Sequence, residues 1–381
     1  MFSVSRCKNL VIIILILLLI IILTGCTTDG ISTPPPPDNE ETVYLGGSFL
    51  QAQKSLLIKQ ENVMQTACYW EIKGDSIKRR DVFTASENVE LSPWIYVKDG
   101  IVYYTGTIDD VDTGITYACY WTISGTDVIK HTIWEEAEAW SIVIDDNSII
   151  YVAGQSEDTA CFWKIEGDNI TKYSLINGSD AIHIALYNDK IFIAGRETTY
   201  DTQIACYWVV DNEGIHHFRL GNENEHSTAL GAFFKNDKYF VAGDSNGPCY
   251  WIINAGTYQL EKKVDLITDT FDNLNAGAIQ IFVDDSNVVY IAGYSTNGLH
   301  SIPVYWVDDG STIKKFVLNE SLDGMATAIW ALEDKIYVSG QYCSDDFETE
   351  QGCYWIIDDN GIQENTFEEK GCRINSIFVC Y

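Results

Sequence analysis

The chain has 381 residues, and its 55 Asp and Glu outnumber its 24 Lys and Arg, which gives a formal net charge of −31. Such an acidic chain repels phosphate groups, so its charge excludes nucleic-acid binding and argues against electrostatic attachment to anionic lipid headgroups. Hydrophobic residues make up 46% of the chain and aromatic residues 13%, which excludes a largely disordered protein.

The first 25 residues have the pattern of an export signal. Arg6 and Lys8 stand near the start, and an unbroken apolar run extends from Leu10 to Leu23. This run is short for a membrane span and typical of the hydrophobic region of a signal peptide. It ends in Leu23-Thr24-Gly25-Cys26, which resembles the lipobox of bacterial lipoproteins. The alternatives are a transmembrane anchor and an ordinary secretory signal.

The lipobox resemblance implies that residues 1–25 are a signal peptide and that Cys26 becomes the lipidated N-terminus. Several acyl chains on one residue anchor a protein stably. The protein would then be extracytoplasmic and attached to a membrane by its lipid, which is the outer membrane if the cell has two. Residues 26–41 contain Pro34-Pro35-Pro36-Pro37 among polar residues, so we expect a disordered stalk.

From residue 42 onward, a pair of strand-like phrases recurs seven times. The first phrase resembles Ile-Tyr-Val-Ala-Gly and occurs at residues 43–47, 102–106, 150–154, 191–195, 239–243, 289–293 and 336–340. The second resembles Cys-Tyr-Trp and occurs at residues 68–70, 119–121, 161–163, 206–208, 249–251, 304–306 and 353–355. A strand-rich repeat with a period of roughly 40 to 60 residues predicts a β-propeller.

Each repeat reads as four short strands, because an apolar stretch precedes the first phrase and a turn and another strand follow the second. The folded part begins in a second strand, Val43 to Gly47, and ends just after an inner strand, Ser376 to Val379. Pairing these two would close the ring and remove its open edges. The sequence therefore predicts an all-β fold: a seven-bladed β-propeller of four-stranded blades over residues 42–381, closed by its N- and C-terminal strands.

These repeats resemble bacterial seven-bladed propellers of the YVTN type. Their Cys-Tyr-Trp strand is similar to repeats of uncharacterised surface lipoproteins that are associated with spirochaetes. The resemblance covers roughly residues 42–381 and implies the fold, but it brings no catalytic or ligand residues with it. The chain contains neither the Asp-box of sialidases nor the complete calcium loop of integrin-like blades.

The cysteines are expected to be free. Six of them occupy equivalent positions in different blades, and stacked sheets lie about 10 Å apart, which is too far for a disulfide or a shared metal. Cys343, Cys372 and Cys380 fall outside this pattern. A disulfide between Cys343 and Cys353, which flank one loop, is the alternative.

Two sets of loops are expected to share one face: those between the second and third strands of a blade, and those that join successive blades. Loops on a rigid frame are where propellers meet partners, and these loops are acidic, with Glu157 and Asp158 among many others. The candidate binding residues are Glu135, Glu136, Glu138, Asp180, Asp269, Asp272, Asp323, Trp140 and Trp330. They suit a cationic partner or divalent ions such as calcium; the alternative is that acidic loops only keep the protein soluble.

The sequence favours a binding or interaction module that acts as a monomer and takes a protein, a glycan or a small ligand at this face. It supplies no catalytic motif, no cofactor site and no defined metal site. His183 lies on an inner strand and is read as a structural histidine. One alternative is a glycosidase-like propeller hydrolase at the channel mouth, because two facing carboxylates would suffice for that chemistry. A scaffold in envelope assembly is the other.

Overall fold

The computed structural model describes residues 41–54, 61–74, 76–86, 94–110, 113–199, 202–266, 276–296, 298–343, 350–369 and 371–380. Residues Glu41–Cys380 form one compact unit. The predicted signal peptide, Cys26 and the stalk up to residue 40 lie outside the described residues. Within the described part of the chain, no helix is long and apolar enough to cross a bilayer.

The described strands form seven antiparallel sheets of four strands each, which we number as blades from the N-terminus. Blade 1 consists of β28 (Arg373–Cys380), β1 (Thr42–Lys54), β2 (Glu61–Lys73) and β3 (Ser76–Ser86). Blade 2 consists of β4 (Ile95–Lys98), β5 (Ile101–Asp110), β6 (Ile115–Ser124) and β7 (Asp127–Glu135). Blade 3 consists of β8 (Ala137–Ile144), β9 (Ile150–Ser156), β10 (Thr159–Glu166) and β11 (Asn169–Ser174).

The remaining blades repeat the same order. Blade 4 consists of β12 (Asp180–Tyr187), β13 (Lys190–Thr198), β14 (Gln203–Asp211) and β15 (Gly214–Arg219). Blade 5 consists of β16 (Ser227–Lys235), β17 (Lys238–Ser245), β18 (Pro248–Asn254) and β19 (Leu260–Asp265). Blade 6 consists of β20 (Gly277–Val283), β21 (Val289–Thr296), β22 (Ser301–Asp308) and β23 (Ile313–Val317). Blade 7 consists of β24 (Gly324–Leu332), β25 (Lys335–Tyr342), β26 (Gln351–Asp358) and β27 (Gly361–Thr366).

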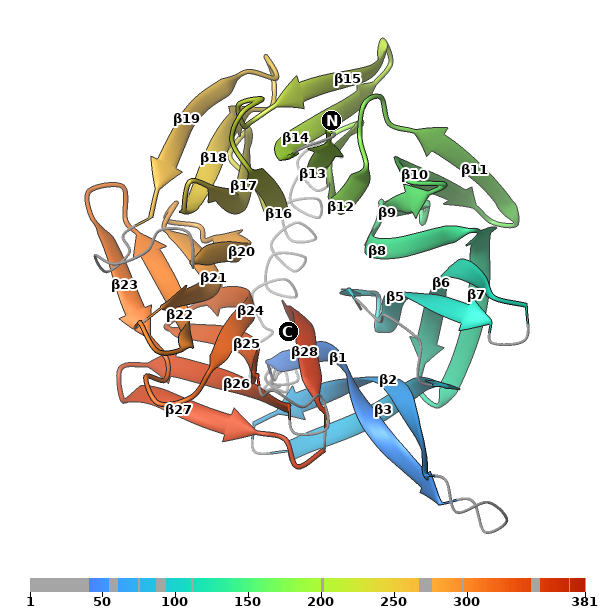
Figure 1. Cartoon of the computed structure of the whole chain (residues 1–381), viewed down its shortest axis with the longest axis vertical. Helices are drawn as coiled ribbons and strands as arrows, with labels where there is room; N and C mark the ends of the chain where they lie inside the picture. Colours follow the sequence, from blue (N-terminus) through green and yellow to red (C-terminus); the bar gives the residue numbers. More distant parts are fainter. Residues whose placement is uncertain are drawn as a thin grey trace, which may run out of the picture. The chain divides into compact units, whose positions relative to one another are not determined.

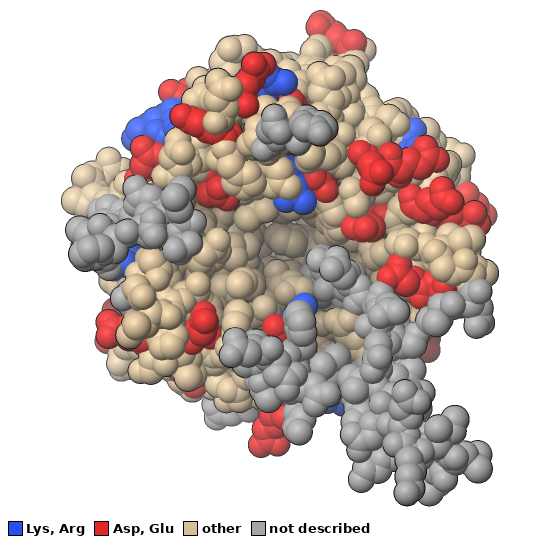
Figure 2. Space-filling model, in the orientation of Figure 1, with Lys and Arg blue, Asp and Glu red and all other residues tan. Residues whose placement is uncertain are grey.

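The blades stand in a ring with the first strand of each repeat innermost (Figure 1), and the centre of this face is hollowed, which we call the channel (Figure 2). The last strand of the chain completes the first blade. β28 pairs antiparallel with β1, so that Val379 lies opposite Val43 and Ile377 opposite Leu45. The predicted seven-bladed propeller and its closure by the two terminal strands are therefore confirmed.

A bulge in the inner strands explains why the first phrase of the repeat ends in glycine. In six inner strands, one residue is skipped in the pairing with the second strand, as in a β-bulge. The bulge presses a carbonyl group against the glycine. A methyl group on Gly154 would lie 1.9 Å from the carbonyl oxygen of Glu138 and 3.0 Å from the Trp163 ring. Only glycine leaves room for both neighbours.

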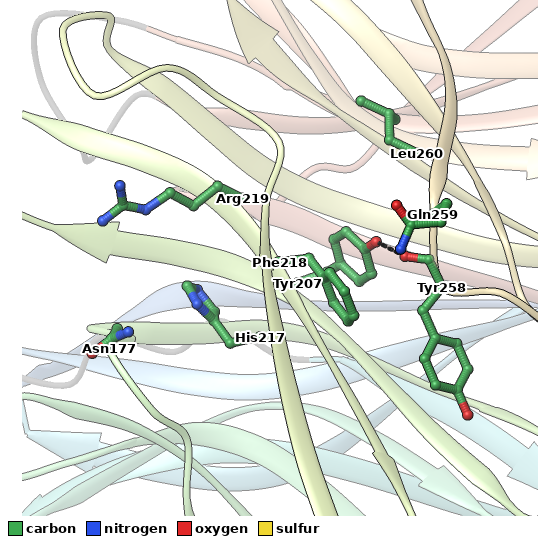
Figure 3. Close-up of a pocket in the computed structure, with 8 residues that line it drawn as sticks. All are labelled: Asn177, Tyr207, His217, Phe218, Arg219, Tyr258, Gln259 and Leu260. Carbon is green, nitrogen blue, oxygen red and sulfur yellow. Dashed lines mark hydrogen bonds between the residues drawn. The ribbon is translucent and has the colours of Figure 1, made fainter.

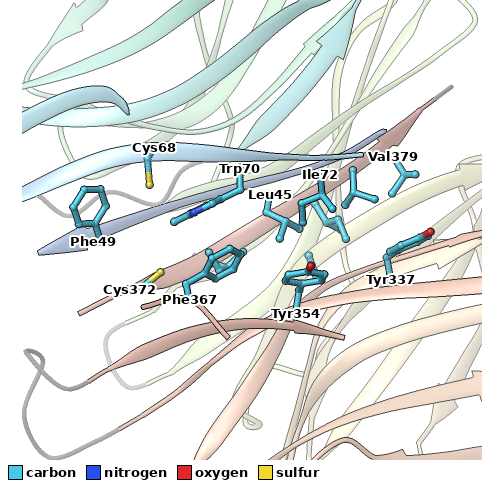
Figure 4. Close-up of a cluster of buried hydrophobic side chains, with 14 residues drawn as sticks. Leu45, Phe49, Cys68, Trp70, Ile72, Tyr337, Tyr354, Phe367, Cys372 and Val379 are labelled. Carbon is cyan, nitrogen blue, oxygen red and sulfur yellow. The ribbon is translucent and has the colours of Figure 1, made fainter. Parts of the chain in front are cut away.

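The core lies between the blades, as the Cys-Tyr-Trp phrase predicts. The seven tryptophans of this phrase are all among the largest fully buried side chains. Where the ring closes, Trp70 of blade 1 packs against Phe367, with ring centroids 4.5 Å apart. Leu45 and Ile72 of blade 1 and Tyr354 of blade 7 belong to the same cluster (Figure 4). Large aromatic rings thus fill the space between neighbouring blades.

All nine cysteines of the described residues are free thiols. The six at equivalent positions are buried, so they pack as small hydrophobic residues. Burial raises the pKa of Cys161 and of Cys249 to about 12, which keeps both as unreactive thiols. The prediction of free thiols is confirmed, and the alternative disulfide between Cys343 and Cys353 is not formed.

Candidate functional site

The two sets of loops meet around a hollow between blades 2 and 3. This hollow has a volume of about 250 Å³ and is lined by residues 114–116 at the start of β6, residues 136–138 at the start of β8, and residues 155–158 from the end of β9 into the turn before β10. The opposite face carries the tight turns within each blade, such as residues 145–149 and 188–190 around another hollow. The strand order places these two kinds of connection at opposite ends of each sheet.

Four carboxylates surround the first hollow, which we call the acidic hollow: Glu136, Glu138, Glu157 and Asp158. Glu136, Glu157 and Asp158 are exposed and adopt the left-handed conformation, with φ between 50 and 57°. The backbone N–H of Glu157 donates to the carbonyl oxygen of Glu136 at 3.4 Å, which ties one loop to the other. Among the described residues, no Lys or Arg pairs with Glu136, Glu157 or Asp158. Figure 2 shows acidic atoms gathered over β7 to β11.

The other predicted acidic residues are in different situations. Asp180 is buried, and its Oδ2 accepts hydrogen bonds from Arg196 Nε and Ser179 Oγ, both at 2.6 Å. It therefore differs from the expected surface carboxylate, because its charge is already paired within blade 4. Asp323 is exposed and accepts a hydrogen bond from the Ser301 N–H at 3.2 Å. Glu135 is exposed at the end of β7, and Asp269 and Asp272 lie outside the described residues.

The two predicted tryptophans do not lie on one surface. Trp140 is the bulged residue of β8, and its carbonyl oxygen accepts a hydrogen bond from Thr105 Oγ1 of blade 2 at 3.2 Å. Trp330 lies two residues before the end of β24, close to the turn into β25. It therefore lies toward the opposite end of the channel from the acidic hollow. The expectation that both belong to the acidic face is corrected for Trp330, because the residue's place along the strand decides its end of the channel.

Trp330 belongs to an aromatic belt that sequence reasoning missed. Rings from inner strands of successive blades touch one another, with centroids 4.7 to 5.4 Å apart: Phe233, Phe282, Trp330, Phe378 and Tyr96. Each lies opposite the second residue of the repeated glycine-ending phrase. Blades 3 and 4 carry Val143 and Ala185 at this position, so the belt is interrupted there. The belt depends on the register of each inner strand against its neighbour and on the packing of successive blades, which only the folded chain fixes.

The channel also holds a pair of rings from blades that are not adjacent. Trp94, just before β4 of blade 2, meets His183 of blade 4 edge to face, with ring centroids 4.7 Å apart. Burial lowers the pKa of His183 to about 4, so the ring is neutral at neutral pH. Its Nδ1 is buried without a hydrogen-bond partner among the described residues. The burial and the ring contact agree with a structural role for His183, but in the described part of the chain Nδ1 lacks the hydrogen bond that we expect of a structural histidine.

Another hollow lies at the outer strands of blades 4 and 5, with a volume of about 510 Å³ (Figure 3). Tyr207 Oη donates a hydrogen bond to the carbonyl oxygen of Tyr258 at 2.6 Å, which ties the two blades together. Tyr258 Oη in turn donates to Asp211 Oδ2 at 2.5 Å. Burial raises the pKa of Asp211, but hydrogen bonds from Tyr258, the Glu213 N–H and His216 outweigh burial and lower it to about 2.

Comparisons with known proteins identify the fold and nothing finer. No protein-family model matches the chain, and no curated protein matches it. A solved structure of a catalytically inactive variant of virginiamycin B lyase from Staphylococcus aureus, with quinupristin, is similar with a TM-score of 0.55 and 12% identity, covering 77% of this chain and 92% of that one.

Two further solved structures are similar at lower scores. A protein of unknown function from Bacteroides caccae has a TM-score of 0.44 and 12% identity, covering 73% of this chain and 94% of that one. The structure of YjhT has a TM-score of 0.43 and 11% identity, covering 73% and 97%. At such identities, likeness in structure extends to the fold and not to the activity. The protein is a seven-bladed β-propeller, and the glycosidase-like and scaffold alternatives stay predictions.

Proposed function

We propose that the protein is a lipid-anchored, extracytoplasmic binding module that holds a basic segment of a partner protein at its acidic hollow. The observation that carries this proposal is the set of carboxylates around one hollow, of which Glu136, Glu157 and Asp158 pair with no described Lys or Arg. Unpaired acidic groups that line a concavity raise the local concentration of cations and speed the encounter with a basic partner.

The frame supports a binding role because it is rigid where the loops are attached. Glu138 lies on β8, whose bulge is packed against Gly154, and Glu157 is tied to Glu136 through the backbone. The loop backbone that carries the carboxylates is therefore positioned before a partner arrives, which reduces the ordering cost of association. The net charge of −31 adds a long-range attraction for basic proteins.

Charge-neutralising substitutions test the acidic hollow directly. The triple variant Glu136→Gln, Glu157→Gln, Asp158→Asn keeps side-chain size, and Asn tolerates the left-handed backbone at position 158. Exposed ion pairs contribute about 0.2 to 1 kcal/mol each, so loss of three should weaken binding of a synthetic oligolysine peptide roughly tenfold. Calorimetry measures this, and binding by the native protein should fall as salt is added.

A matched triple variant provides the control. Asp127, Asp168 and Asp359 are exposed at turns within the blades, on the face opposite the acidic hollow. Their replacement by Asn removes the same total charge and should leave most of the affinity intact. Equal weakening by both triple variants would mean that the peptide responds only to net charge. Binding of calcium in place of the peptide at the same carboxylates would assign the hollow to ions.

The lipid anchor is a separate part of the proposal and rests on Leu23-Thr24-Gly25-Cys26. We propose that Cys26 carries the lipid and that the protein faces outward from the membrane as a monomer. Cells fed labelled palmitate should incorporate the label into the native chain, and Cys26→Ala should abolish it. Retention of label by Cys26→Ala would reject the assignment, and failure of peptide binding would leave this part of the proposal unaffected.

A further inference from the structure

Blade 4 brings a carboxylate, a thiol and an imidazole together at one point. Glu197 lies on β13, Cys206 on β14 and His217 on β15. One ligand atom from each residue lies within 4.8 Å of the other two. Glu197 and Cys206 are buried, with 3% and 0% of their surface exposed, and the His217 side chain is 14% exposed. Three neighbouring strands of a single sheet therefore hold the group in place.

The polar contacts of this group are with one another and with Arg219, whose Nε donates hydrogen bonds to Glu197 Oε1 at 3.1 Å and Oε2 at 3.0 Å. Glu197 Oε1 lies 2.6 Å from His217 Nε2, and this buried nitrogen has no other hydrogen-bond partner among the described residues. Glu197 Oε2 lies 2.8 Å from an Arg219 terminal nitrogen, and Arg219 also pairs with Glu223. Arg219 thus fixes the carboxylate from one side, as outer-shell partners do around metals.

The other blades lack this combination at the same register positions. Six blades share the Cys of the Cys-Tyr-Trp phrase, whereas blade 6 has Val304. In every blade, a residue of the outermost strand pairs with the Trp of this phrase. Opposite the Trp, five blades carry a Lys or Arg, namely Arg79, Lys130, Lys172, Lys263 and Lys315, and blade 7 carries Glu364. Two residues beyond the repeated glycine, where blade 4 has Glu197, the other blades have Phe49, Ile108, Ser156, Ser245, Ser295 and Tyr342.

We propose that Glu197, Cys206 and His217 form a binding site for a divalent transition metal of the zinc class. Thiolate, imidazole and carboxylate are the ligands that zinc prefers, and three of them commonly leave a fourth position for another ligand. On binding, the Cys206 S–H bond breaks, a sulfur–metal bond forms, and the proton passes to solvent. Together with Arg219, the dication then balances the charges of the thiolate, Glu197 and Glu223, as a buried site requires. His217 and Arg219 also line the hollow of Figure 3, which offers an entry route.

The test uses the full chain, freed of metal with a chelator and kept in detergent. Titration with Zn²⁺ should show one tight site per chain, with release of one proton per ion when buffers of different ionisation enthalpy are compared. Co²⁺ should produce the ultraviolet charge-transfer band of a thiolate–cobalt bond. This band requires no variant and distinguishes the blade 4 site from ions held by surface carboxylates.

Variants assign the band to the three residues. Cys206→Ser should remove it and weaken Zn²⁺ binding by more than about 100-fold, beyond the 10- to 100-fold that follows loss of an outer-shell partner. Glu197→Gln and His217→Ala should each weaken Zn²⁺ binding. The matched control is Cys249→Ser, the equivalent position of blade 5, which has Ser245 and Lys263 in place of Glu and His. It should keep both the band and the affinity.

Stability provides a second readout if a variant folds poorly. A ligand that binds the native state raises Tm, so excess Zn²⁺ should raise the Tm of the native chain and of Cys249→Ser. It should not raise that of Cys206→Ser. The inference is overturned if the native chain shows no thiolate–cobalt band, or if Cys206→Ser binds Zn²⁺ as tightly as the native chain. Neither result bears on the peptide binding that we propose for the acidic hollow, which its own assay tests.

Discussion

Substitutions in the closing strand β28 should destabilise the folded protein strongly, and Ile374 on this strand allows the effect to be measured. Its side chain is fully buried in the cluster between blades 1 and 7. A methyl group on Gly47 of blade 1 or on Gly352 of blade 7 would lie 3.1 Å from an Ile374 side-chain carbon. Thr327 Oγ1 of blade 7 also donates to the Ile374 carbonyl oxygen at 2.6 Å. Ile374 therefore packs against both blade 1 and blade 7 where the ring closes.

Replacing Ile374 with Ala removes three carbons from this contact. At about 0.8 kcal/mol per buried CH₂, the lost transfer free energy is roughly 2.4 kcal/mol, and the cavity that remains brings the total to about 2 to 5 kcal/mol. Urea denaturation followed by circular dichroism gives the change in the free energy of unfolding. The control is Ile362→Ala on the outer strand β27, where the side chain is 46% exposed and the cost should be within about 0.5 kcal/mol. Equal costs for the two variants would refute the idea that β28 is packed between blades 1 and 7.

Three further outcomes are expected. Because the pKa of His183 is about 4 and an unfolded His titrates near 6.5, the unfolded chain protonates first as pH falls. The contribution of neutral His183 is complete above about pH 6.5 and declines by about 3 kcal/mol by pH 4. His183→Gln should remove this slope from denaturation curves measured across pH, and a larger effect from the exposed His226→Gln would contradict the assignment. Gly154→Ala should destabilise the folded protein by about 1 to 3 kcal/mol or more, since the new methyl group would clash with the carbonyl oxygen of Glu138. Gly256→Ala, whose methyl would lie only 3.3 Å from a side-chain oxygen, should be nearly neutral in thermal melts, and the reverse order would refute the bulge explanation. Tyr250→Phe should cost about 1 to 3 kcal/mol in urea denaturation, because it removes the 2.7 Å hydrogen bond to buried Asp308. No loss with Tyr250→Phe would mean that Asp308 finds another donor.

The acidic hollow was partly predictable. Glu136 and Glu138 could be assigned to a loop face because repeat position fixes the end of the sheet at which a loop emerges. Asp180 could not be separated from them, since only the folded chain brings Arg196 from the next strand to within 2.6 Å of its carboxylate. Trp330 shows the same limit, because its exact position along β24 decides which end of the channel its side chain reaches.

The repeat by itself determined the number of blades, the order of strands within them and the joining of β28 to β1. Each phrase has the residue pattern of a strand, and in every repeat the same strand precedes it and the same strand follows it. It also placed seven tryptophans in the core. Tertiary structure alone decided the bulges, the aromatic belt and the convergence of Glu197, Cys206 and His217. These depend on the register between paired strands and on the packing of neighbouring blades, and a shift of one residue would turn each side chain to the other face of its sheet.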